Sequence, residues 1–319
     1  MLLGQHMIIY CSINEEGETL MSRLQQIIAT AVLLSIILSG QSSDKWTPDV
    51  SIKLKSISQL QFSPSGNQLA MVVRKALIEG EKSEYLNQIW MSRLESNSPH
   101  QFTYGDKSAS RPRFSPDSKH LAFISERTEE SQVWVMRTDG GEARQFSYEK
   151  ESVSNFEWAP DGTQIAFLMK DSKTEEEEEQ EKEKRDVIIV DENFKYSHIY
   201  VKQFATEVDT NGADRITEGN FSVNSFNWSP DSRRIVFAHS LEPTFNSRSI
   251  SGDISVVSLS DKSMTILVEW PGVDADPVFS PDGKWVAFAS DGGKIERIGL
   301  ADCFVVSSKG GKPKKLAET

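Results

Sequence analysis

A ten-residue phrase that occurs five times is the feature that most limits how this chain can fold. Each copy starts with an aromatic residue, continues with Ser or Ala, then Pro and small polar residues, and ends in an apolar run. The copies are FSPSGNQLAM from Phe62, FSPDSKHLAF from Phe114, WAPDGTQIAF from Trp158, WSPDSRRIVF from Trp228 and FSPDGKWVAF from Phe279. Pro presets φ at the second position of a turn, Asp or Ser bonds the nearby backbone, and Gly tolerates a positive φ. Each phrase is therefore predicted to be a tight turn between two β-strands.

Further strands follow each phrase in a fixed order. Directly after the turn, Leu121 and Phe123 alternate with small Ala122, which predicts a strand with a second sheet packed closely on the alanine face. Another apolar strand is predicted in each unit, at residues 89–91, 133–135, 199–201, 254–257 and 304–306. A third comes after a turn, and its apolar residue stands 12 residues before the next aromatic in the pairs Phe102–Phe114, Phe146–Trp158, Ile216–Trp228 and Leu267–Phe279.

Units of about 45–50 residues with this content are typical of four-stranded propeller blades. The sequence predicts an all-β fold, a β-propeller of four-stranded blades with about five blades present. A β-sandwich would need the constant offset to be coincidental. Leu316 takes the third-strand position of the fifth unit, so the next aromatic would fall beyond Thr319. We therefore expect the ring to be incomplete.

The interval between the third and fourth phrases is 70 residues, against 44 to 52 elsewhere. It contains TEEEEEQEKEKR over residues 174–185. Like charges in such a run repel one another, and a core cannot bury them unpaired. We predict an exposed acidic insertion over residues 171–190.

The N-terminal residues 1–40 are predicted to be an upstream segment and a signal peptide. Residues 27–38 form a run of twelve residues of low polarity behind Arg23, which suits a signal-peptide core and is short for a membrane span. Residues 1–20 hold three Glu and no Lys or Arg, so the signal peptide is assigned to residues 21–40 and the propeller to residues 41–319. This predicts a periplasmic or secreted protein. An uncleaved membrane anchor is the alternative.

Charge and the scarce ligand residues limit the chemistry. The chain has 35 Lys and Arg against 47 Asp and Glu, a net charge of −12, which disfavours nucleic acid as a partner. Two cysteines and five scattered histidines give no metal-ligand spacing, and Asp274 with Asp276 supplies too few oxygens for calcium. Glu129 and Glu130 are interpreted as a solvated hairpin tip. We assign no metal, no cofactor and no catalytic residue, because no Gly-x-Ser-x-Gly nucleophile elbow is present.

The repeat resembles the propellers of two groups: the prolyl oligopeptidase family of serine peptidases, especially dipeptidyl peptidases and acylaminoacyl-peptidases, and the TolB protein of the Tol system. The resemblance covers residues 48–319. The long insertion, with 185–192 followed by 195–201, looks like the fourth-blade region of secreted peptidases, and residues 46–50 lead directly into the first blade. Both features favour the peptidases.

The peptidase resemblance implies that a catalytic α/β-hydrolase domain, absent from this chain, would bear the Ser, Asp and His. It also implies peptide substrates, and that propeller carboxylates of some members hold the substrate's amino group. The leading hypothesis is the gating, substrate-selecting propeller of a secreted serine peptidase that cleaves short peptides, inactive alone. The alternatives are a TolB-like periplasmic scaffold that binds proteins and a free-standing sugar- or peptide-binding propeller.

Overall fold

The computed structural model describes residues 48–79, 82–95, 98–184, 194–244, 251–295 and 301–316. The chain divides into two compact units, Met1–Lys53 and Leu54–Thr319. The described part of the first unit is the short helix α2 (Pro48–Lys53). The predicted signal peptide at 21–40 and the segment before it lie outside the described residues.

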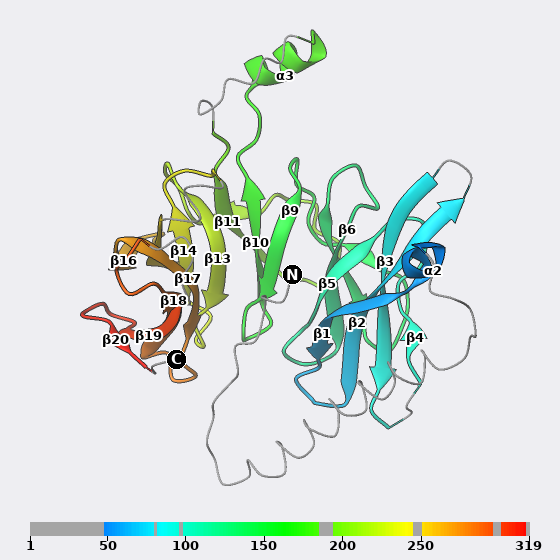
Figure 1. Ribbon diagram of the computed structural model, residues 1–319, viewed down its shortest axis with the longest axis horizontal. Coiled ribbons are helices and arrows are strands. Elements are labelled where there is room, and N and C mark those ends of the chain that lie inside the picture. Colours follow the sequence, from blue (N-terminus) through cyan, green and yellow to red (C-terminus); the bar gives the residue numbers. More distant parts are fainter. Residues whose placement is uncertain are drawn as a thin grey trace. The chain divides into compact units, whose positions relative to one another are not determined.

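The second unit consists of five consecutive four-stranded antiparallel blades (Figure 1). Blade 1 contains β1 (Ser56–Phe62), β2 (Gln68–Glu79), β3 (Lys82–Arg93) and β4 (His100–Gln101). Blade 2 contains β5 (Ala109–Phe114), β6 (His120–Ser125), β7 (Gln132–Arg137) and β8 (Arg144–Gln145). Blade 3 contains β9 (Val153–Trp158), β10 (Gln164–Lys170), β11 (Ser197–Gln203) and β12 (Asp214–Arg215).

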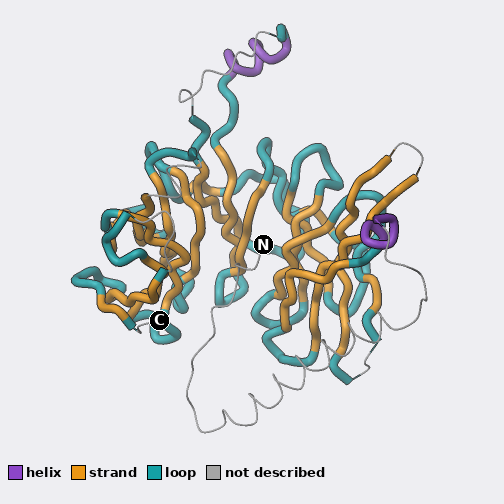
Figure 2. The backbone as a smooth tube through the Cα atoms, in the orientation of Figure 1, coloured by secondary structure: helices purple, strands orange, loops and turns teal. Residues whose placement is uncertain are grey.

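Blade 4 contains β13 (Ser222–Trp228), β14 (Arg234–Ser240), β15 (Ser251–Ser258) and β16 (Met264–Val268), and blade 5 contains β17 (Gly272–Phe279), β18 (Trp285–Ser290), β19 (Asp302–Ser307) and β20 (Lys314–Lys315). These two blades are joined by a short parallel pairing of β15 with β17 at Ser251–Gly272 and Gly252–Val273. The predicted all-β propeller of four-stranded blades is confirmed, and strands dominate the whole described chain (Figure 2).

The five phrases form equivalent turns between the first and second strands of their blades. In every turn the N–H of the fifth phrase residue donates to the carbonyl of the second, over 2.8 to 2.9 Å. The Asp carboxylates accept backbone N–H groups two residues on, as predicted; the acceptors are Asp117, Asp161, Asp231 and Asp282. The same prediction is wrong for Ser65, because its hydroxyl donates to the Asn67 side chain over 2.7 Å.

The fifth phrase residue alternates between Gly and Ser along the chain, and all five have positive φ: Gly66, Ser118, Gly162, Ser232 and Gly283. Both serines reach back to the preceding blade. The Ser118 hydroxyl accepts from the Ser65 N–H at 3.0 Å, and the Ser232 hydroxyl accepts from the Asp161 N–H at 3.1 Å. Two turns are thereby tied to their predecessors.

The glycine turns contact the preceding blade through proline. A Cβ on Gly162 would lie 3.6 Å from Pro116 Cδ, and one on Gly283 would lie 3.6 Å from Pro230 Cδ. The turns of blades 2 and 3, and of blades 4 and 5, therefore pack against each other.

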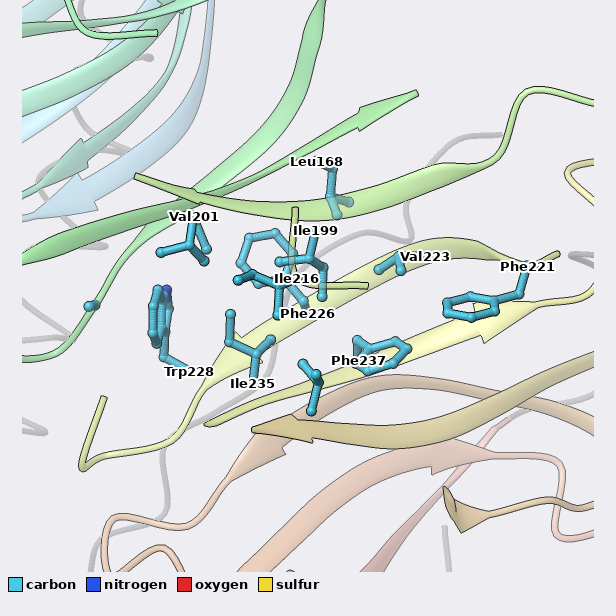
Figure 3. Close-up of a cluster of buried hydrophobic side chains, with 13 residues drawn as sticks. Leu168, Ile199, Val201, Ile216, Phe221, Val223, Phe226, Trp228, Ile235 and Phe237 are labelled. Carbon is cyan, nitrogen blue, oxygen red and sulfur yellow. The ribbon is translucent and has the colours of Figure 1, made fainter. Parts of the chain in front are cut away.

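Apolar faces of neighbouring blades form the core between them (Figure 3). Between blades 3 and 4, Ala166 and Ile199 pack in one cluster with Trp228 and Phe237. Ala166 and Phe237 are fully buried, which confirms the prediction that a small residue faces the next sheet. Burying a phenylalanine side chain contributes about 2–3 kcal/mol, so such clusters hold the blades together.

The predicted third-strand positions are confirmed in four blades. Residues Phe102, Phe146, Ile216 and Leu316 each donate their N–H to a carbonyl of the preceding strand over 2.7 to 2.8 Å. In blade 4 the offset is wrong by one residue: Val268, not Leu267, lies opposite Ile254, because the pairing of β15 with β16 shifts register at that point. The hydrophobic pattern does not reveal this irregularity.

The acidic insertion carries a helix, α3 (Glu175–Lys182), on the connection between β10 and β11 (Figure 1). None of its residues is buried, which confirms the predicted exposure of this part; residues 185–190 lie outside the described residues. The helix was not predicted. Its N-terminus is a capping box between Thr174 and Glu177, and lysines offset the charge repulsion. The ion pairs are Lys173–Glu181, Lys195–Glu177 and Lys150–Glu178.

Candidate functional site

The first strands of the blades, here called the inner strands, are β1, β5, β9, β13 and β17. Strand β1 contacts β5, β5 contacts β9, and β13 contacts β17. In a propeller the innermost strands face the central axis. The positions one and three residues before each phrase aromatic are polar, with one exception at Val278: Gln59, Gln61, Arg111, Arg113, Asn155, Glu157, Ser225, Asn227 and Asp276. We call this set the inner polar residues.

Every inner strand breaks register with its neighbour near these positions. Three inner polar residues adopt a left-handed backbone, with φ of 52° at Gln59, 54° at Arg111 and 48° at Asp276. A non-glycine residue in this region costs on the order of 1–2 kcal/mol, and such strain concentrates at functional sites. This backbone strain recurs in three blades at the position three residues before the phrase aromatic. The inner polar residues are therefore a candidate functional site.

Hydrogen bonds link the inner polar residues from blade to blade. The Arg111 N–H donates to Gln59 Oε1 over 2.5 Å, and Arg111 Nη1 donates to Asn155 Oδ1 over 3.3 Å. Arg111 thus connects blades 1, 2 and 3 and is held in place while its side chain stays exposed.

A second set of contacts connects blades 3, 4 and 5 at Glu157. The Phe279 N–H donates to Asn227 Oδ1 over 3.0 Å, which leaves the Asn227 amide NH₂ to donate to the Glu157 carboxyl. Burial raises the pKa of Glu157 to about 7, although the positive charge of Arg113 acts in the opposite direction. Glu157 therefore changes charge near neutral pH.

Tryptophan side chains fix the backbone at the same positions. Trp158 Nε1 donates to the Arg113 carbonyl over 3.2 Å, and Trp228 Nε1 donates to the Glu157 carbonyl over 3.3 Å. Each phrase tryptophan thus holds the preceding blade's inner polar residue. The arrangement is suited to binding polar groups by guanidinium, amide and carboxyl side chains on a fixed frame.

Ser225 is the one hydroxyl among the inner polar residues, and no hydrogen bond joins it to a histidine in the described part of the chain. The Ser255 hydroxyl lies 2.8 Å from His239 Nε2, but Ser255 is fully buried and His239 Nδ1 has no hydrogen-bond partner. A catalytic serine needs access to substrate and a histidine oriented by a third group. This buried pair is a packing contact.

The carboxylates considered from the sequence lie apart from that set, except Asp276. Glu129 is exposed and the Glu130 carboxylate accepts from the Ser152 hydroxyl, as a hairpin tip would. Asp274 is 2% exposed, and burial raises its pKa to about 6. In the described part of the chain, no three His, Cys, Asp or Glu residues are grouped to hold a metal ion.

Apart from Asp276, the inner polar residues were not predicted from the sequence. The sequence carries a signal for them, since both positions are polar in four of the five repeats, but alternation on a strand usually indicates a solvated face.

A second series of polar residues was also not predicted. It consists of Gln88, Gln132 and His198, each beside a hydroxyl of Thr or Ser at 2.6 to 3.2 Å. In blade 3 this places a fully buried histidine where the first two blades have glutamine.

Residues 83–185 match the family described as the Tricorn protease N-terminal beta propeller domain. Over 285 residues, 80% of this chain, the sequence is 29% identical to "Dipeptidyl-peptidase 5" of Porphyromonas gingivalis. The resemblance to a peptidase propeller is confirmed. A shorter match, 35% identical over 81 residues, is to "Uncharacterized peptidase YuxL" of Bacillus subtilis. The chain spans 41% of the first relative's length and 12% of the second's.

Solved structures agree on the fold. Acylaminoacyl peptidase of Pyrococcus horikoshii matches with a TM-score of 0.61 and 20% identity, over 86% of this chain and 41% of that one. A putative TolB of Agrobacterium tumefaciens matches with a TM-score of 0.50 and 19% identity, over 82% of this chain and 81% of that one. At these identities the likeness concerns the propeller fold alone.

Proposed function

We propose that this chain is the substrate-selecting propeller of a secreted serine peptidase that cleaves short peptides, of the dipeptidyl- or acylaminoacyl-peptidase type. The observation that carries the proposal is the 80% of the chain aligned with a dipeptidyl peptidase. The TolB alternative rests on a structural likeness that concerns fold only.

In this proposal one domain carries out catalysis and the propeller selects the substrate. An α/β-hydrolase domain outside residues 1–319 supplies the serine, the histidine and the oxyanion donors that peptide hydrolysis needs. The propeller limits access by size, and its inner polar residues interact with the peptide on the way to the catalytic serine. Rigid blades with fixed polar side chains suit such a filter.

Exposed faces of the terminal blades support a larger ring. Phe62 is 41% exposed, whereas the equivalent aromatics of blades 2 to 5 are 4–8% exposed because each packs against the blade before it. In blade 5, Ala287 and Val305 are half-buried, although the equivalent Ala122 and Val135 are covered by blade 3. We propose that further blades cover these faces, since apolar blade faces are stable when stacked.

The proposed export rests on the sequence of residues 21–40. No described helix is long and apolar enough to cross a membrane. Mass spectrometry of the exported protein is expected to find an N-terminus near Gln41. A mature protein that keeps residues 21–40 and sediments with membranes would support the anchored alternative and contradict cleavage.

The activity test compares two proteins. One is the 319-residue chain, and the other is the same chain with any coding sequence that continues past Thr319. Both are offered aminoacyl- and dipeptidyl-nitroanilides, with and without a serine-directed fluorophosphonate. We expect release of nitroaniline only from the second protein, blocked by the fluorophosphonate.

Hydrolysis by the 319-residue chain would contradict the proposal that the catalytic residues lie in another domain. An extended protein that is inert and unlabelled by the fluorophosphonate would refute the peptidase proposal and favour a scaffold.

A further inference from the structure

One inner strand carries an arginine at both of its inner polar positions, which none of the other four described inner strands does. Arg111 and Arg113 both belong to β5, on either side of its register break. Neither forms an ion pair within 4 Å in the described part of the chain, although its net charge is strongly negative.

The surroundings keep both groups in place. Burial lowers the pKa of Arg113, Glu157 acts against that effect, and repulsion from Arg111 adds to it. Arg113 Nη1 donates to the Pro112 carbonyl over 3.2 Å, and Arg111 Nη1 donates to Asn155. These neutral acceptors orient the guanidinium groups and leave most of their donors available.

We propose that Arg111 and Arg113 form a binding site for a carboxylate group of a peptide, and that Glu157 competes with this carboxylate for Arg113. That the ligand is a peptide rests on the proposed function; the carboxylate preference rests on the two guanidinium groups. Guanidinium donors match carboxylate oxygens in charge and geometry, and the left-handed backbone of Arg111 is the strain expected at a binding residue.

The competition gives binding a pH dependence with a defined sign. The charge that acts on Glu157 is that of Arg113 from β5, and β13 contributes the neutral amide of Asn227. Arg111 acts on Arg113, and the neutral Asn155 accepts from Arg111. Because burial raises the pKa of Glu157 to about 7, the carboxyl is mostly neutral at pH 6 and mostly ionised at pH 8. Peptide carboxylates stay ionised over this range. Binding should therefore weaken as the pH rises from 6 to 8.

The experiment measures binding by fluorescence anisotropy with the 319-residue chain. The probe is the pentapeptide Ala-Gly-Ala-Gly-Ala with tetramethylrhodamine at its N-terminus, a dye that does not titrate in this range. Three forms are compared: the free acid, the C-terminal amide, and the amide with Glu at the central position. Binding of the free acid alone assigns the site to a peptide C-terminus. Equal binding of the Glu-containing amide assigns it to any peptide carboxylate.

Three substitutions test the residues. Arg113→Gln and Arg111→Gln should each weaken binding of the free acid about tenfold, as loss of a charge-assisted hydrogen bond does. Glu157→Gln should bind at pH 8 as tightly as the unchanged protein does at pH 6, a gain of up to about tenfold at pH 8. Arg137→Gln is the matched control, because that exposed arginine on β7 is paired with Asp139.

Equal binding of all three peptides, or equal losses in Arg113→Gln and Arg137→Gln, would overturn the proposal. If Arg113→Gln fails to fold by its thermal melt, the pH profile of Glu157→Gln decides, and an unchanged profile overturns the competition. Since no hydrolysis is measured, an inert extended protein that still shows these effects would refute the peptidase proposal and leave the carboxylate site standing. An extended protein that hydrolyses peptides but shows none of these binding effects would refute the carboxylate site and leave the peptidase proposal standing.

Discussion

His239 on β14 makes the fold sensitive to acid. The imidazole is 6% exposed and packs against Phe221 and Phe237, with ring centroids 4.9 and 5.3 Å away. Its Nε2 contacts the Ser255 hydroxyl, whereas Nδ1 has no partner. The protonated imidazole carries an N–H on both nitrogens, so the one at Nδ1 would have nothing to accept it. Burial lowers the pKa of His239 from 6.5 to about 4.

The sign and size of the effect follow from proton linkage. Between pH 6.5 and pH 4 the unfolded chain binds a proton at this histidine and the folded chain does not, so the free energy of unfolding falls as the pH falls. From pH 7.5 to pH 5 the loss from this one group is about 2 kcal/mol.

His239→Met tests the reasoning, since Met169 occupies the equivalent position in blade 3 and is 6% exposed. Urea unfolding at pH 7.5 and pH 5 measures the loss in each protein, and any cost of leaving Ser255 unpaired cancels in the difference between the two pH values. We expect the variant to lose about 2 kcal/mol less than the unchanged protein. The exposed His100 supplies the control His100→Met. Equal losses in His239→Met and the unchanged protein would refute a buried neutral imidazole.

Three further predictions concern stability at neutral pH. Asp231→Ala removes the acceptor for the Arg233 N–H and the Ser229 hydroxyl and should cost about 1 kcal/mol in thermal melts, whereas Ser65→Ala should cost clearly less; equal costs would contradict the turn argument. Trp228→Phe loses the bond to the Glu157 carbonyl and should lower the free energy of unfolding by about 1 kcal/mol, an effect that His100→Met should not show. Deleting Glu175–Lys182 should change the free energy of unfolding by less than about 1 kcal/mol, because no α3 residue is buried. A larger loss would show that the ion pairs of α3 stabilise the fold.

The repeat made much of the fold predictable. Pro64, Pro116, Pro160, Pro230 and Pro281 follow the first strands of their blades, as the phrases indicate. Turn chemistry is local, so it can be read from a few adjacent residues. The helix at Glu175–Lys182 was missed because charge repulsion was weighed without the capping box at Thr174 and the lysines at 150 and 195, which are distant in sequence.

The candidate site was far less predictable. Arg113 and Glu157 stand 44 residues apart, and their relation depends on two blades packing side by side. The left-handed backbone at Arg111 lies at a break in strand pairing. The residue types around Arg111 do not predict this break. Sequence alone identifies polar residues on a strand; it does not distinguish a solvated face from an inner edge.

The alternation of Gly and Ser at the fifth phrase position sets a parity rule for this propeller. Each serine turn reaches back to a glycine turn, and each serine turn's proline packs forward on the next glycine. The structural period is therefore two blades rather than one. Gain or loss of a single blade would bring two like turns together, whereas gain or loss of a pair would preserve every contact. A closed ring that keeps the alternation throughout must contain an even number of blades, and a ring with an odd number must contain one junction of a different kind.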